Sequence, residues 1–114
     1  MKNILVVDDD ANIRKILSVV LTDAGYRVVI AEDGETAMEL LGYNFFDFVL
    51  TDLEMPGGIS GEEVISAVKL KGISVEKIGL MSGQHNKGSK VANSHGVRFL
   101  SKPFNLRDVL DLVA

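Results

Sequence analysis

The chain has 114 residues, of which 46% are hydrophobic and 25% charged, as is typical of one globular domain with its own core. Its formal net charge of −4 disfavours direct nucleic-acid binding, because nucleic-acid surfaces concentrate Lys and Arg. The absence of cysteine excludes disulfides, thiolate nucleophiles and zinc–thiolate sites. No apolar run approaches the roughly 20 residues that cross a bilayer, and the short apolar N-terminus does not resemble a signal peptide. We therefore expect no membrane contact and a cytoplasmic location.

In chain order, short apolar runs alternate with segments of helical periodicity. The apolar runs predict five strands, at residues 4–7, 27–31, 46–51, 77–81 and 97–100. Apolar spacing predicts five helices, at residues 13–24, 36–41, 60–68, 87–95 and 105–113. Gly25 and Gly42 are expected to end the first two helices, whereas Ser60 and Asn105 are expected to cap the third and fifth. We place Leu106, Val109, Leu110 and Val113 on the buried face of the last helix.

This alternation predicts one domain, residues 1–114, with no effector domain among them. Strands that alternate with helices form a parallel sheet covered on both faces. Right-handed crossovers leave few topologies, of which the flavodoxin-like strand order 2-1-3-4-5 is the natural choice. In that order the first and third strands are neighbours.

Carboxylates follow both of these strands. Asp8 and Asp9 come directly after residues 4–7, and Asp52 comes directly after residues 48–51. At about 4 Å, two such charges repel by roughly 4 kcal/mol at an effective dielectric of 20. With no Cys or His beside them, the arrangement favours a hard cation, and Mg²⁺ suits carboxylates and phosphate oxygens together. Asp10, one residue further along, is better read as a helix cap.

Four segments resemble the motifs of response-regulator receiver domains, the phosphoacceptors of two-component signalling that include the chemotaxis regulators. They are residues 4–9 (ILVVDD), 51–56 (TDLEMP), 80–83 (LMSG) and 100–104 (LSKPF). They occur in family order, and the likeness covers almost the whole chain.

The resemblance implies that Asp52 accepts a phosphoryl group from a histidine kinase or phosphotransfer protein. It also implies that Asp9, Asp52 and the backbone carbonyl of Glu54 bind Mg²⁺, and that Asp8 acts largely through water. Such a domain catalyses only its own phosphorylation and dephosphorylation, and is not a turnover enzyme. Output then passes through the surface of the fourth helix, fifth strand and fifth helix to a protein target or a second copy.

Three further residues take roles from the resemblance. Lys102 would contact a phosphate oxygen, with a cis bond to Pro103, although a lone lysine is more often solvated. Ser82 would donate its hydroxyl to the phosphoryl group, although it also suits a plain turn beside Gly83. Phe99 falls on the family's switch aromatic, although an aromatic residue in a strand is usually part of the core.

Some features depart from the family pattern. The loop at residues 56–61 carries one residue more than usual, and Phe99 lacks the hydroxyl of the commoner tyrosine. Glu54 and Gln84 flank the expected position of the attacking water and should set the lifetime of the phosphoryl group. We expect His85 and His95 to be solvated.

Three rival interpretations stay open at this point. A haloacid-dehalogenase-like phosphatase would use Asp8 as nucleophile, but it leaves Asp52 without a role. A flavodoxin-like cofactor module needs a phosphate cradle after the first strand, where three aspartates would repel phosphate. A degenerate receiver that acts only as a scaffold is disfavoured because every expected site group is present.

Overall fold

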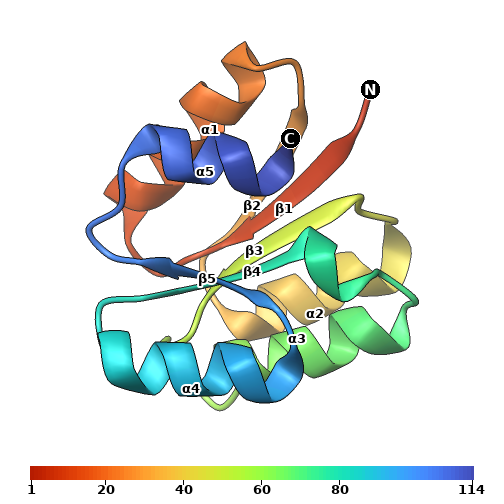
Figure 1. Ribbon diagram of the computed structural model, residues 1–114. Helices are drawn as coiled ribbons and strands as arrows, with labels where there is room; N and C mark the ends of the chain where they lie inside the picture. The colour runs from red at the N-terminus through yellow and green to blue at the C-terminus, as the bar shows by residue number, and fades with distance from the viewer.

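The computed structural model describes all residues from 1 to 114 and contains one parallel sheet with helices on both faces (Figure 1). The strands are β1 (Asn3–Val7), β2 (Arg27–Ala31), β3 (Phe48–Asp52), β4 (Ile78–Ser82) and β5 (Arg98–Ser101). The helices are α1 (Ala11–Asp23), α2 (Gly34–Tyr43), α3 (Gly61–Leu70), α4 (His85–His95) and α5 (Leu106–Val113), with a short 3₁₀ turn η1 (Val75–Lys77) before β4. The strand order β2-β1-β3-β4-β5 confirms the predicted flavodoxin-like fold.

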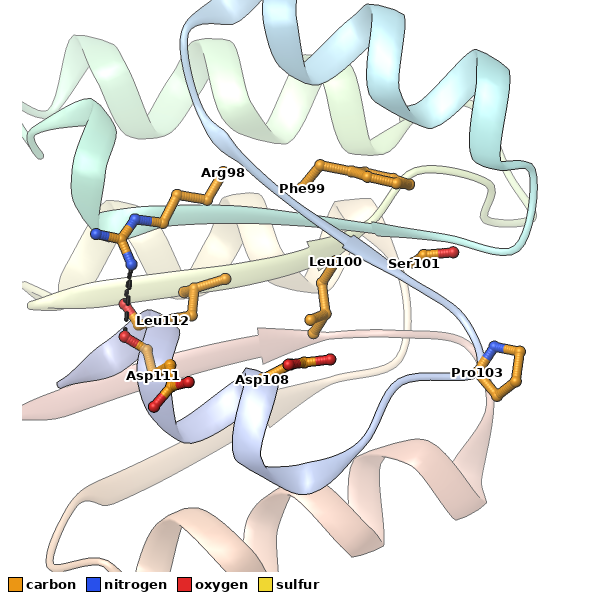
Figure 2. Close-up of a pocket in the computed structure, with 8 residues that line it drawn as sticks. All are labelled: Arg98, Phe99, Leu100, Ser101, Pro103, Asp108, Asp111 and Leu112. Atoms are coloured by element: carbon orange, nitrogen blue, oxygen red, sulfur yellow. Dashed lines mark hydrogen bonds between the residues drawn. The ribbon is translucent and has the colours of Figure 1, made fainter.

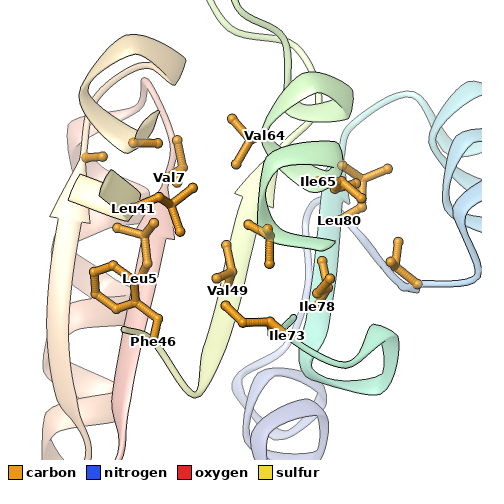
Figure 3. Packing of buried hydrophobic residues seen from close by; sticks show 14 of the residues in the cluster. Leu5, Val7, Leu41, Phe46, Val49, Val64, Ile65, Ile73, Ile78 and Leu80 are labelled. Carbon is orange, nitrogen blue, oxygen red and sulfur yellow. The ribbon is translucent and has the colours of Figure 1, made fainter. Parts of the chain in front are cut away.

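The helices form two layers, α1 and α5 on one face of the sheet and α2, α3 and α4 on the other (Figure 1). Successive strand residues point to opposite faces, so each strand contributes to both cores. Leu5 and Val7 pack with Val49 under α2 and α3, as Figure 3 shows, whereas Ile4 and Val6 pack under α1 and α5. Burial on both faces explains why the strands read as continuous apolar runs.

The predicted end of the second helix is wrong. The prediction placed this helix at residues 36–41 and ended it at Gly42, but α2 continues to Tyr43. The helix begins earlier because Asp33 caps it by accepting a 2.7 Å hydrogen bond from the Thr36 amide. It ends where Asn44 turns to an extended conformation, so Gly42 is simply accommodated in the last turn.

The buried face of α5 also differs from the prediction. Val109 and Val113 are buried as expected, but Leu106 and Leu110 are 44% and 36% exposed, and Leu112 is buried in their place. The apolar pattern alone was ambiguous because leucines lie on more than one side of this helix. Packing against the sheet selects the stripe that contains residues 109, 112 and 113.

The remaining differences are at element boundaries. The third strand was predicted at residues 46–51 and is observed at residues 48–52, because Phe46 is buried in the core but lies outside the hydrogen-bonded ladder. In the first helix, Ile16 is exposed although it is one of the apolar residues whose spacing predicts this helix. No helix combines the length and apolar character that a membrane span requires.

Candidate functional site

The three predicted carboxylates meet at the carboxyl edge of the sheet. Val7 of β1 pairs with Thr51 of β3, so Asp8 and Asp52 follow neighbouring ladder positions. One oxygen from each of Asp8, Asp9 and Asp52 lies within 4.8 Å of the others. Asp8 and Asp52 are only 0% and 5% exposed, whereas Asp9 is exposed. The predicted convergence of these three residues is confirmed.

Backbone contacts hold Asp8 in this position. The Asp10 amide donates to Asp8 Oδ1 at 2.9 Å, and Asp10 caps α1 by accepting from the Asn12 amide at 2.8 Å, as predicted. From the second turn of α1, Arg14 Nη1 donates to the carbonyl oxygen of Asp8 at 2.8 Å. The sequence interpretation missed Arg14, because nothing in the motif indicates that its side chain folds back along the helix.

Lys102 lies across from the carboxylates and is not a freely solvated lysine. Its ammonium nitrogen is 2.7 Å from Asp8 Oδ2 and 3.3 Å from Asp52 Oδ1, and the side chain is 20% exposed. The Lys102 amide donates to the carbonyl oxygen of Ser82 at 2.8 Å, which ties this loop to the end of β4. The Lys102–Pro103 bond is cis, as predicted.

Burial and charge perturb the ionisation of the site. Burial, and then repulsion by Asp8, raises the pKa of Asp52 to about 7, although Lys102 opposes this shift. Burial tends to lower the pKa of Lys102, but its contacts with Asp8 and Asp52 outweigh burial and raise that pKa above its usual value. Perturbed groups of this kind, gathered in one place, are typical of functional sites.

The donor set fits a hard divalent cation. Three carboxylates converge with no histidine or cysteine among them, and such oxygen ligands suit Mg²⁺. Asp8 Oδ2 is buried and has no hydrogen-bond donor other than the Lys102 ammonium group, so it has capacity for a further cation. The residues present therefore fit Mg²⁺.

The loop that follows Asp52 is tied to the end of β3. The Gly61 amide donates to the carbonyl oxygen of Leu53 at 3.0 Å. A β-carbon on Gly61 would collide with the carbonyl oxygen of Asp52, so only glycine permits this approach. Gly61 therefore holds the end of this loop against the backbone beside Asp52.

Ser82 ends β4 inside the site and is fully buried. Its hydroxyl donates to Glu54 Oε1 at 2.9 Å and accepts from the Gln84 amide at 2.9 Å. The plain-turn interpretation of Ser82 is therefore incomplete, because its side chain joins β4 to the loop after β3. No motif indicates the contact with Glu54, which lies 28 residues away along the chain.

Phe99 lies between the site and α4. It is partly buried against the core on the α4 side, and a β-carbon on Gly88 would lie 2.5 Å from its ring and 2.8 Å from Ser82 Cβ. Gly88 therefore allows α4 to approach both residues closely. His85 is exposed, as predicted, and its ring meets the Phe99 ring edge-on at 5.5 Å.

The prediction that His95 is solvated is wrong. His95 Nε2 lies 2.8 Å from Glu62 Oε2, and His95 Nδ1 lies 3.2 Å from the ammonium nitrogen of Lys69, so the end of α4 is joined to α3. Because an ammonium group can only donate, Nδ1 accepts from Lys69 and Nε2 donates to Glu62.

A hollow lies between the edge strand β5 and α5 (Figure 2). Asp108 and Asp111 line it from α5, and Phe99 and Ser101 line it from β5. Arg98 closes one end by donating to the carbonyl oxygens of Asp111 and Leu112 at 3.5 and 3.4 Å, drawn as dashed lines in Figure 2.

Two curated proteins similar to this chain are a sensor kinase/phosphatase and a response regulator, both from bacteria. The chain is 33% identical over 112 residues to the CAI-1 autoinducer sensor kinase/phosphatase CqsS of Vibrio cholerae. The aligned region covers 96% of this chain and 16% of that protein. It is 34% identical over 109 residues to the response regulator MprA of a Mycobacterium species, covering 94% and 46% respectively. The chain thus spans about half or less of the length of these relatives.

Solved structures agree with this likeness. The response regulator TrrA of Thermotoga maritima, determined in complex with Mg²⁺–BeF, has a TM-score of 0.85 and 36% identity, over 99% of this chain and 96% of that one. The chemotaxis response regulator CheY4 of Vibrio cholerae has a TM-score of 0.85 and 31% identity, over 100% and 99%.

A family profile described as the response regulator receiver domain matches residues 4–114. This match covers nearly the whole chain and includes all four motifs and the acidic site that they form. It leaves no support for the phosphatase alternative, in which Asp52 has no role. The chain therefore belongs to the response regulator receiver domain family of two-component signalling.

Proposed function

We propose that this chain accepts a phosphoryl group on Asp52 from a phosphohistidine of a histidine kinase or phosphotransfer protein. The observation that carries the proposal is the convergence of Asp52 with Asp8, Asp9 and Lys102 at one largely buried point. A carboxylate that is buried beside both a cation-binding group and a lysine can act as a nucleophile toward phosphorus.

In this reaction an oxygen of Asp52 attacks the phosphorus atom. The new O–P bond forms as the N–P bond to the donor imidazole breaks, and the imidazole nitrogen keeps the electron pair of that bond. Water later hydrolyses the aspartyl phosphate and releases phosphate. The domain thereby catalyses only its own phosphorylation and dephosphorylation.

Asp8, Asp9, Asp52 and the backbone carbonyl of Glu54 would hold Mg²⁺, with Asp8 acting largely through water. When bound, the ion supplies positive charge that offsets the charge of the transferring group. Lys102 supplies a second positive charge, and its contacts with Asp8 and Asp52 keep its ammonium group beside the phosphoacceptor.

The same residues connect phosphorylation to output. Ser82 would donate its hydroxyl to the phosphoryl group, and Phe99, which packs near Ser82 against Gly88, would change its packing in response. This change would alter the α4-β5-α5 surface, which includes the hollow beside Arg98, for a protein target or a second copy. We place this action in the cytoplasm, without direct contact with nucleic acid or membrane, and treat residues 1–114 as one receiver domain.

Labelling with acetyl phosphate and Mg²⁺ tests the phosphoacceptor. The wild-type protein should gain one acid-labile phosphate, and peptide mapping after borohydride reduction should place it on Asp52. Asp52→Asn should abolish the label, whereas the control Asp47→Asn, which lies before β3 at the opposite end of the sheet, should keep it. A label that persists in Asp52→Asn, or that maps to Asp8, would refute the assignment.

A second variant tests the route to output. Lys102→Ala should still bind a phosphoryl group but should no longer transmit the change to Phe99 and the α4-β5-α5 surface. Side-chain NMR of Phe99, with and without beryllofluoride, measures this response. A Phe99 ring that responds as in the wild type would exclude a coupling role for Lys102.

A further inference from the structure

We propose that the side chain of Glu54 is a positioning residue that holds Ser82 in the unphosphorylated receiver and must release it when Asp52 is phosphorylated. This inference rests on the proposed function, because it concerns how the same site accepts its phosphoryl group. It assigns to the Glu54 carboxylate a role separate from that of the Glu54 backbone carbonyl.

The hydroxyl of Ser82 has only one proton, and that proton is already engaged. Ser82 Oγ lies 2.9 Å from Glu54 Oε1, a good distance for a hydrogen bond to a carboxylate. The carbonyl oxygen of Gln84 lies 3.4 Å away and is a much weaker acceptor. The Gln84 amide donates to Ser82 Oγ at 2.9 Å, so the hydroxyl is fixed in its role as donor to Glu54.

The proposed function requires the same proton for another acceptor. A phosphoryl group on Asp52 would accept from Ser82, and one O–H group cannot form two short hydrogen bonds at once. The contact between Ser82 and Glu54 and the contact between Ser82 and the phosphoryl group are therefore alternatives. The Glu54 carboxylate also carries the same sign of charge as the phosphoryl group, so repulsion adds to the competition.

The contact with Ser82 satisfies only one of the two carboxylate oxygens of Glu54. Glu54 Oε2 is buried and has no hydrogen-bond partner, and a buried unpaired oxygen of this kind is unfavourable. If the side chain turns outward, this oxygen regains contact with water. This regained hydration favours rotation of the Glu54 side chain away from Ser82 when the phosphoryl group is present.

The affinity for beryllofluoride, measured with Mg²⁺ present, tests this competition. Glu54→Ala should bind beryllofluoride about tenfold more tightly than the wild type, because a hydrogen bond to a charged group no longer competes. Glu54→Gln keeps an acceptor but loses the charge, so its affinity should lie between the two. Glu32→Ala, which removes an exposed carboxylate just after β2 at the same sheet edge, should stay within about twofold of the wild type.

Repeating the substitution in a Ser82→Ala background separates the hydrogen bond from charge alone. If Glu54 acts mainly by holding Ser82, the gain in affinity from Glu54→Ala should be much smaller in that background, where only the relief of charge repulsion remains. An undiminished gain there would overturn the proposal, as would equal affinities of Glu54→Ala and the wild type.

A spectroscopic measurement on the unphosphorylated protein gives a readout independent of binding. The Gln84 amide resonance should shift in Glu54→Ala toward its position in the wild-type protein with beryllofluoride, because this amide donates to Ser82 Oγ. An unmoved resonance would count against the proposal. Acetyl phosphate labelling keeps the two hypotheses apart, because a wild type that is never labelled on Asp52 contradicts the proposed function itself.

Discussion

The two ends of the sheet bury different kinds of side chain. At the carboxyl end lie all the buried polar residues of the protein, which are Asp8, Thr51, Asp52 and Ser82. At the amino end, buried residues such as Ile78 are apolar, and Tyr43 and Phe45 are 86% and 65% exposed. Three carboxylates converge there beside a single lysine, so their burial and mutual repulsion should make the carboxyl end unfavourable for stability. The amino end and the middle of the sheet should supply the stability.

The largest effect on stability is expected at the amino end. Ile78→Ala should lower the free energy of unfolding by roughly 2–4 kcal/mol, because Ile78 is fully buried and its truncation leaves a cavity. Urea unfolding measures this change. Val75→Ala, at a nearby residue that is 38% exposed, is the matched control and should cost well under about 1 kcal/mol. Equal effects of the two substitutions would contradict the assignment of stability to this end.

At the carboxyl end, the substitution Asp52→Asn should increase stability rather than decrease it. In the absence of Mg²⁺ it should raise the free energy of unfolding at pH 8 by roughly 2 kcal/mol, because it removes a buried charge. Since the pKa of Asp52 is raised from 3.8 to about 7, the folded protein binds this proton more tightly than the unfolded chain does. The wild type therefore loses stability as the pH rises from about 4 to about 7.

The pH dependence supplies the control for that substitution. The advantage of Asp52→Asn should shrink as the pH falls from 8 toward 4, because Asp52 is then protonated in the folded protein and no longer carries a buried charge. Asp47→Asn should show no such gain, because Asp47 accepts a 2.7 Å hydrogen bond from the Asn3 amide. A stability difference that is independent of pH would mean that Asp52 is ionised in the folded protein throughout this range.

Mg²⁺ should reverse the unfavourable electrostatics of the carboxyl end. At about ten times its dissociation constant, the ion should stabilise the wild-type protein by about 1.4 kcal/mol, because it binds only the folded site. Thermal unfolding with and without MgCl₂ measures the shift, and NaCl of equal ionic strength is the control. Mg²⁺ should stabilise Asp52→Asn less than the wild type, since this variant has lost a proposed ligand. Equal stabilisation of the two proteins would place the ion elsewhere.

The smallest effect is expected at the exposed aromatics of the amino end. Phe45→Ser should change the free energy of unfolding by less than about 0.5 kcal/mol, because most of its side chain already contacts water. Acetyl phosphate labelling of Asp52 should also be unchanged. A loss of more than about 1 kcal/mol would show that this loop contributes to the core after all.

Much of the site could be predicted because a parallel sheet brings the ends of its strands to one edge. Asp8 and Asp52 lie 44 residues apart, yet each follows an apolar run, so the strand order alone made them neighbours. Ser82 and Lys102 reach the same edge because they follow the apolar runs at residues 77–81 and 97–100. Strand boundaries were less accurate, as Phe46 illustrates, because an apolar residue next to a strand contributes to the core without joining the ladder.

The sequence by itself determined the alternation of strands and helices and the composition of the acidic edge, since both follow from periodicity and position within each βα unit. Only the tertiary structure decided that Ser82 donates to Glu54, that Arg14 supports Asp8 and that His95 joins Glu62. These contacts depend on how each helix is rotated and which path each loop takes. Packing between elements distant in the sequence sets those two quantities, and local patterns do not encode them.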